Sequence, residues 1–140
     1  MSTRTQASRQ RSRRALVAIG ALAMVVSAAF GATPAELSSA YAAQSGTPGQ
    51  PARGQQFFTA VHTRDWSCAS CHGAEPTQGG RHASTGKPIA PLAPAANPNR
   101  FIDTAKAEKW FRRNCNDVLG RECSAAEKAD VLAWLITLKL

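Results

Sequence analysis

The arrangement of two cysteines and one histidine most limits what this chain of 140 residues can fold into. Cys68, Cys71 and His72 form a Cys-X-X-Cys-His sequence. In one helical turn this spacing presents two sulfurs to the two vinyl groups of a haem, and the next side chain then reaches the iron. A thioredoxin-like redox pair would need a βαβ framework, and a zinc site would need two further ligands at short spacing. The sequence therefore predicts one covalently bound haem c, with His72 as the proximal axial ligand.

Residues 1–42 have the layout of a removable leader. Five arginines and no acidic residue lie within the first fourteen positions, and an uncharged run rich in Ala, Val and Leu follows up to residue 35. This pattern is typical of a secretory signal peptide, and the Ala40-Tyr41-Ala42 sequence predicts cleavage after Ala42. We therefore expect a periplasmic protein without stable membrane insertion. The alternative is an uncleaved membrane anchor, for which the run is only weakly hydrophobic.

The rest of the chain predicts one domain that does not bind nucleic acid. Half of the formal net charge of +8 belongs to residues 1–42, and no clustered basic motif with groove-reading or base-stacking residues follows them. Residues 43–51 are rich in Gly, Pro and Ser, which predicts a flexible tether. Residues 52–140 are then expected to form a single cytochrome domain.

Apolar residues at helical spacing predict an all-α fold. Helices are expected over residues 52–61, from a cap at Asp103 or Thr104 to about residue 115, and from a capping box of Ser124 and Glu127 to about residue 139. Their apolar stripes are Gly54, Phe57, Phe58 and Val61; Ala107, Trp110, Phe111 and Asn114; and Val131, Trp134, Leu135 and Leu138. Prolines and glycines between residues 73 and 99 predict an ordered loop, and we expect no strand.

The second axial position of the iron lacks the usual thioether. The only methionines are Met1 and Met24, both in the leader, so the mature protein cannot use the methionine ligand common in electron-carrying cytochromes c. The remaining candidates are His62, His82, an amine, an amide oxygen or an open site. Asn114 is the amide candidate because periodicity places it on a buried helix face. On periodicity alone, a structural asparagine is the more usual explanation of such a position.

Four segments resemble the sphaeroides haem protein family of class I cytochromes c, and the resemblance covers nearly the whole chain from Gly54 onward. The segments are residues 85–94 (TGKPIAPLAP), 112–116 (RRNCN), 120–123 (GREC) and 127–135 (EKADVLAWL). The resemblance implies that Asn114 is the sixth ligand in the ferric state and leaves on reduction, which opens a site for oxygen, nitric oxide or carbon monoxide. A neutral amide oxygen is a hard, weak ligand that prefers ferric to ferrous iron, which agrees with this assignment.

The resemblance also implies a disulfide between Cys115 and Cys123, and an electron donor that is a dihaem cytochrome c supplied by a membrane b-type cytochrome. We expect four side chains to line the haem pocket: Ile89, Leu92, Trp110 and Phe111. The other ring nitrogen of His72 should be anchored by a backbone carbonyl of the proline-rich loop, at Pro88 or Pro91.

Two classes of function remain open. In the first, the protein transfers electrons and binds diatomic ligands at the haem iron after Asn114 is released. In the second, it is an enzyme that reduces oxygen, peroxide or nitric oxide, although efficient cleavage of an O–O bond usually needs a distal acid-base residue. We favour the first class because no such residue lies near Asn114 in the sequence, unless the fold brings His62 or His82 there. Basic residues on the outer face of the same helix are either solvated or steer an acidic donor: Lys106, Lys109, Arg112 and Arg113.

Overall fold

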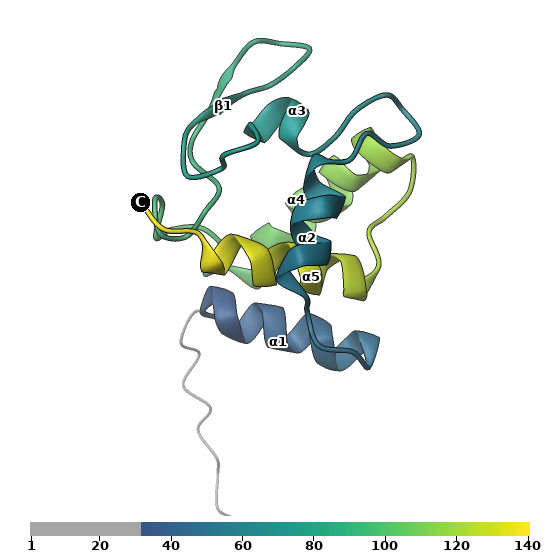
Figure 1. Ribbon diagram of the computed structural model, residues 1–140, viewed down its shortest axis with the longest axis vertical. Helices are drawn as coiled ribbons and strands as arrows, with labels where there is room; N and C mark the ends of the chain where they lie inside the picture. Colours follow the sequence, from purple (N-terminus) through teal and green to yellow (C-terminus); the bar gives the residue numbers. More distant parts are fainter. Residues whose placement is uncertain (1–31) are drawn as a thin grey trace, which may run out of the picture.

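The computed structural model describes residues 32–140, so residues 1–31 of the expected signal peptide lie outside the described residues. Within that part of the chain the helices are α1 (Pro34–Ser45), α2 (Pro51–Thr59), α3 (Ala69–His72), α4 (Thr104–Leu119) and α5 (Ala125–Thr137). Two short antiparallel strands, β1 (Gly80–Arg81) and β2 (Pro88–Ile89), pair with Gly80 opposite Ile89. In Figure 1, α1 and the region of α3 and β1 lie on opposite sides of α5.

The hydrophobic core lies where α1, α2 and α5 meet. Leu132 and Leu135 of α5 are fully buried, and the Phe58 ring of α2 lies 5.0 Å from the Trp134 ring between their centroids. The α2 and α5 backbones approach so closely at Gly54 that an added Cβ would overlap the carbonyl of Asp130. The glycine on the apolar stripe of α2 therefore permits a close helix crossing, which brings the segment before the haem motif onto the C-terminal helix.

Helix α1 corrects the domain boundary predicted at residue 42. Thr33 and Glu36 form a capping box at the start of α1, while Leu37 and Tyr41 are only 3% and 4% exposed against the core. Cleavage after Ala42 would remove both side chains from the folded domain. The error has a physical reason: small alanines at alternate positions mark a signal cleavage site, but they are equally good helix formers.

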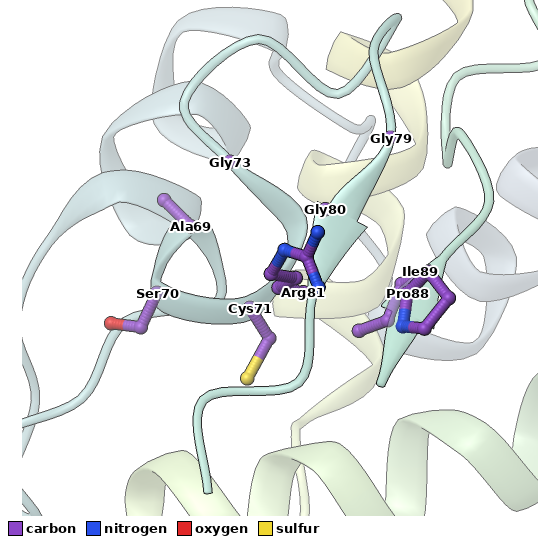
Figure 2. A pocket seen from close by; sticks show the side chains of 9 residues that line it. All are labelled: Ala69, Ser70, Cys71, Gly73, Gly79, Gly80, Arg81, Pro88 and Ile89. Carbon is purple, nitrogen blue, oxygen red and sulfur yellow. The ribbon is translucent and has the colours of Figure 1, made fainter. Parts of the chain in front are cut away.

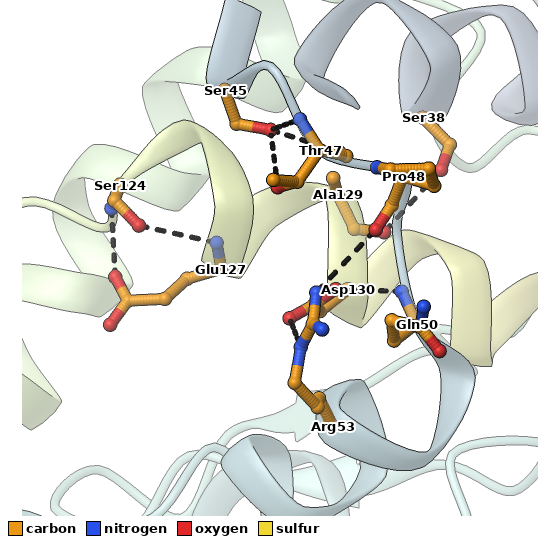
Figure 3. A network of polar contacts seen from close by, with 10 residues as sticks. All are labelled: Ser38, Ser45, Thr47, Pro48, Gln50, Arg53, Ser124, Glu127, Ala129 and Asp130. Carbon is orange, nitrogen blue, oxygen red and sulfur yellow. Dashed lines mark hydrogen bonds and ion pairs between the residues drawn. The ribbon is translucent and has the colours of Figure 1, made fainter. Parts of the chain in front are cut away.

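The tether predicted for residues 43–51 is also wrong. Helix α1 continues to Ser45, and the next residues are held by Asp130 of α5, as Figure 3 shows. One carboxylate oxygen of Asp130 accepts the Gln50 backbone N–H at 2.7 Å, and the other accepts Arg53 Nε at 2.7 Å. Composition alone predicts flexibility here because the partner that orders the segment lies 80 residues further along the chain.

The other predicted elements differ from the structure mainly at their ends. Helix α2 stops at Thr59, which leaves Val61 outside the helix and 69% exposed rather than on the buried stripe. Helix α4 is capped by Asp103, whose carboxylate accepts the Lys106 backbone N–H at 2.9 Å, and it runs one turn past Cys115. The predicted capping box of Ser124 and Glu127 starts α5.

The proline-rich loop contains the β1–β2 hairpin, which the sequence did not predict because each strand has only two residues. Such short strands carry no alternating pattern of polar and apolar residues. Between residues 32 and 140, no helix has the length and hydrophobicity needed to cross a membrane.

Candidate haem site

The Cys-X-X-Cys-His sequence forms the single turn of helix that its spacing predicts. The carbonyl of Cys68 accepts the backbone N–H groups of Cys71 at 3.3 Å and His72 at 3.0 Å. Two serines stabilise the turn: Ser67 Oγ accepts the Ser70 backbone N–H at 3.0 Å, and Ser70 Oγ accepts the Ser67 N–H at 2.9 Å. Sequence reasoning missed this reciprocal pair, although a Ser-X-X-Ser pattern around the first cysteine is a visible signal for it.

The hairpin covers one side of this turn. Gly80 of β1 lies so close to α3 that an added Cβ would overlap the Cys71 carbonyl and lie 2.8 Å from the His72 Cα. The Ala83 backbone N–H donates to the Cys71 sulfur at 3.3 Å. The resulting groove has a volume of about 440 Å³. Figure 2 shows the side chains that line it, with Cys71 on one side and Ile89 of β2 on another. The expected pocket residue Ile89 therefore lies beside the haem motif.

Both cysteines of the motif are free thiols, and both are half-buried. Burial raises the pKa of Cys68 to about 11, so this thiol is protonated at neutral pH. Cys115 and Cys123 are bonded to each other and are therefore unavailable to a zinc ion shared with Cys68 and Cys71. The two free thiols lie on one helical turn directly before His72, and this arrangement fits covalent attachment to a haem.

His72 is enclosed in a way that fits an iron ligand. Its ring lies 6.1 Å from the Phe58 ring between centroids, and its Nδ1 atom is buried without a hydrogen-bond partner among residues 32–140. Burial, followed by the positive charge of Arg100, lowers the pKa of His72 to about 4. The imidazole is therefore neutral at pH 7, which is the form that binds a metal.

The expected anchor of His72 at Pro88 or Pro91 is absent from the described residues. The Pro91 carbonyl instead accepts Arg100 Nε at 2.9 Å and Asn97 Nδ2 at 3.3 Å. Arg100 also donates to the Ala90 carbonyl at 2.7 Å, so its guanidinium is fixed close to the imidazole. Sequence reasoning missed Arg100, because a single arginine in a proline-rich loop gives no periodic or motif signal.

Asn114 lies half-buried on α4, one residue before the disulfide. The sulfurs of Cys115 and Cys123 are at bonding distance, with 5.5 Å between the Cα atoms, so the pairing implied by the resemblance is present. On the same helix, Phe111 packs against the core and meets the Tyr41 ring edge-on at 5.9 Å between centroids. Asn114 therefore lies on α4 between Phe111, which contacts Tyr41, and the disulfide at Cys115.

The four residues expected to line the haem pocket have different surroundings in the structure. Leu92 and Phe111 pack against the hydrophobic core, whereas Ile89 lines the groove beside α3. Trp110 is 43% exposed, which corrects its expected place on the buried stripe of α4, and the Arg113 guanidinium lies 5.8 Å from its ring centroid. Trp110 faces outward because the apolar face of α4 is narrow, with Ala107, Cys115 and Val118 as its buried residues.

The two other histidine candidates have local partners. One ring nitrogen of His62, Nε2, lies 2.9 Å from the Phe57 carbonyl, and its ring packs on the Phe57 ring. Nδ1 of His82 accepts the Thr85 backbone N–H at 3.3 Å within the turn of the hairpin. These contacts favour structural roles for both side chains.

Comparison with known proteins decides the family. A family model described as a domain of unknown function (DUF1924) matches residues 44–135. The cytochrome c-type protein SHP of Cereibacter sphaeroides is 50% identical over 107 residues, which cover 74% of this chain and 82% of that protein. This chain belongs to the SHP family of c-type cytochromes. A solved structure of oxidized SHP, described as an oxygen-binding cytochrome c, matches with a TM-score of 0.71 at 47% identity, over 76% of this chain and 97% of that one.

A second relative of this SHP-family chain is cytochrome c'' of Methylophilus methylotrophus, which is 43% identical over 97 residues, 69% of this chain and 67% of that protein. The crystal structure of its oxidized form matches with a TM-score of 0.69 at 37% identity, over 76% of this chain and 95% of that one. The solution structure of the same protein, whose description refers to the structural basis of haem-ligand detachment, matches with a TM-score of 0.65. The predicted all-α cytochrome fold is confirmed, and the cofactor of the family is covalent haem c.

The match to SHP also bears on where the domain begins. It spans 74% of the 140 residues, or about 104, whereas only 98 residues follow Ala42. The region shared with SHP therefore extends into α1, in agreement with the burial of Leu37 and Tyr41.

Proposed function

We propose that this SHP-family cytochrome transfers electrons in the periplasm and binds diatomic ligands in a redox-gated way. Cys68 and Cys71 would hold one haem c covalently, and His72 would bind its iron from the proximal side. The haem supplies an iron that cycles between the ferric and ferrous states. Asn114 would occupy the distal position in the ferric state through its amide oxygen and leave on reduction, which would admit oxygen, nitric oxide or carbon monoxide.

The position of Asn114 is the observation that carries this proposal. Asn114 is a half-buried amide on the helix that also packs Phe111 against the core, and it directly precedes the Cys115–Cys123 disulfide. Residues 25–140 contain no methionine that could take the distal position. Because a carboxamide oxygen is a hard donor, it binds ferric iron better than ferrous iron, so reduction favours its departure.

Replacing Asn114 tests the proposal. The ferric optical spectrum of Asn114→Ala should change from six-coordinate toward five-coordinate, while the reduced wild type should be high-spin and should shift its bands under carbon monoxide. Asn116→Ala is the matched control, because Asn116 lies on the same helix but is exposed, and its side chain donates to the Arg112 carbonyl. An unchanged ferric spectrum in Asn114→Ala, or a sharp low-spin α band in the reduced wild type that carbon monoxide does not shift, would refute the proposal.

We further propose that the basic face of α4 docks the electron donor. Lys106, Lys109, Arg112 and Arg113 are all exposed on this helix. The family resemblance suggests a dihaem cytochrome c as donor, itself supplied by a membrane b-type cytochrome. Steering between opposite charges is screened by salt, so the rate of reduction by the donor should fall steeply with ionic strength. A rate that hardly depends on salt would exclude this face as the dock.

The contacts of His62 and His82 support ligand binding over catalytic turnover. Both histidines have backbone partners, at the Phe57 carbonyl and the Thr85 N–H. Reduction of peroxide or oxygen at the site would need one of them as a distal acid-base group. Electron transfer with reversible ligand binding requires no such group.

A further inference from the structure

Four side chains from three helices form a cluster that the proposed function does not use. Lys128 of α5 donates to Glu108 of α4 at 2.7 Å, and its ammonium lies 5.2 Å from the Tyr41 ring centroid and 5.9 Å from that of Phe111. Tyr41 belongs to α1, and its ring meets the edge of Phe111. We call Tyr41, Glu108, Phe111 and Lys128 the α4 anchor.

The α4 anchor is enclosed, which makes its ion pair different from a surface salt bridge. The side chains of Lys128 and Glu108 are 12% and 34% exposed, and the Tyr41 hydroxyl is buried without a hydrogen-bond partner among the described residues. An exposed pair contributes little, but removing one partner of an enclosed pair leaves a charge that is poorly solvated. The cluster therefore strongly favours the arrangement in which α1, α4 and α5 stay in register.

The α4 anchor lies next to the proposed distal ligand. Phe111 precedes Asn114 by three residues, so the two side chains are neighbours on one face of α4. The disulfide follows directly at Cys115. In the stretch of α4 between the buried residues Ala107 and Cys115, the contacts of Glu108 and Phe111 therefore fix where the helix lies against α1 and α5. A shift of α4 toward or away from the haem motif would have to disturb these two contacts.

We propose that the α4 anchor is a positioning device that sets how readily Asn114 leaves the ferric iron. This inference rests on the proposed distal role of Asn114. Neutralising Lys128 removes the attraction between α5 and α4 and leaves Glu108 without its counter-ion. Helix α4 then gains freedom to move at the level of Asn114, and the distal position opens more often without any change in the residues that hold the haem.

The rate at which cyanide binds the ferric, haem-loaded protein measures this opening, because an external ligand must wait for Asn114 to leave. Lys128→Met keeps the apolar stem and removes the charge, and we expect it to raise the cyanide binding rate by about tenfold, the factor that a change of about 1.4 kcal/mol in the opening step produces. Lys128→Arg keeps the charge and should restore a rate close to that of the wild type. If Lys128→Met does not accumulate as folded protein, Glu108→Gln gives the same test.

Glu122→Gln is the matched control. Glu122, in the segment before α5, also pairs with α4, through Arg112 at 3.6 Å, but both side chains are more than 60% exposed. It should leave the cyanide rate unchanged. Equal rate changes in Glu122→Gln and Lys128→Met, or a lower melting temperature of Lys128→Met with no change in rate, would overturn the inference.

Asn114→Ala separates this inference from the proposed function. If Asn114→Ala binds cyanide no faster than the wild type, the distal role of Asn114 itself fails. If Asn114→Ala binds cyanide much faster while Lys128→Met matches the wild type, the distal role stands and only the positioning role of the α4 anchor is lost.

Discussion

The domain has two halves, and each is held in place by a different kind of interaction. The first half, made of α1, α2 and α5, is joined mainly by apolar packing: α5 alone has five buried apolar residues among its 13. The second half contains α3, the hairpin and α4, and the longer helix α4 has only three buried residues among its 16. Besides a few apolar contacts, such as those of Ala107 and Phe111 with the core, its links to the rest of the domain are discrete: the disulfide, the Lys128–Glu108 pair and Thr63 Oγ1 donating to the Leu119 carbonyl at 2.8 Å.

This contrast suggests why the haem motif and the proposed distal ligand both lie in the second half. A densely packed region resists small displacements, since each shift disturbs many contacts at once. A helix held by a few identifiable groups can move when one of them changes. The packed half therefore supplies stability, and the sparsely packed half is suited to a ligand that binds and leaves.

Gly54→Val should have the largest effect on stability, because Gly54 lies in the packed half where the backbones of α2 and α5 are in contact. Its Cβ would overlap the Asp130 carbonyl, and backbone atoms cannot move aside as a flexible side chain can. We expect a loss of about 3 kcal/mol in the free energy of unfolding, measured by urea denaturation. Gln55→Val carries the same substitution on an exposed position of α2 and should cost far less. Similar losses in the two variants would contradict the close crossing.

Removing the disulfide should have the next largest effect. On the chain-entropy model, Cys115→Ala with Cys123→Ala should lower the free energy of unfolding by about 2 to 3 kcal/mol. If the bond also limits the movement of Asn114, cyanide should bind the ferric double variant faster than the wild type. The single variant Cys123→Ala breaks the same bond without a reductant and should reproduce both changes. Unchanged ligand kinetics would leave the disulfide with a stabilising role alone.

Of the three changes, Gly80→Ala should lower the free energy of unfolding least, but it should also impair the attachment of haem. The added Cβ would overlap the Cys71 carbonyl, but the short hairpin can move outward, so we expect a loss of about 1 to 2 kcal/mol. The fraction of purified protein with covalently attached haem should fall, as measured by the pyridine haemochrome assay. At the neighbouring Gly79, an added Cβ would meet the Ile89 carbonyl at 3.2 Å, so Gly79→Ala should be better tolerated. Equal haem content in the two variants would argue against Gly80 as support for the motif.

The parts of the site that depend on neighbours in sequence were predictable. The turn of Cys68, Cys71 and His72 and the capping box of Ser124 and Glu127 both close within five residues. Their partners are therefore visible in the sequence, and the structure has them as predicted. The carbonyl expected to anchor His72 was not predictable in the same way, because Arg100 and Asn97 bond the Pro91 carbonyl through the fold of the loop.

The sequence by itself determined the chemistry of the chain: two thiols and an imidazole on one turn, no methionine after residue 24, and an amide on α4. Only the tertiary structure decided that α1 belongs to the domain, because the burial of Leu37 and Tyr41 depends on α5. The same holds for the pairing of Lys128 with Glu108, 20 residues apart, and for the ordering of Gln50 by Asp130, 80 residues away. The physical reason is that hydrogen bonds within one turn are specified by spacing, whereas burial and enclosed charge depend on which distant helices meet.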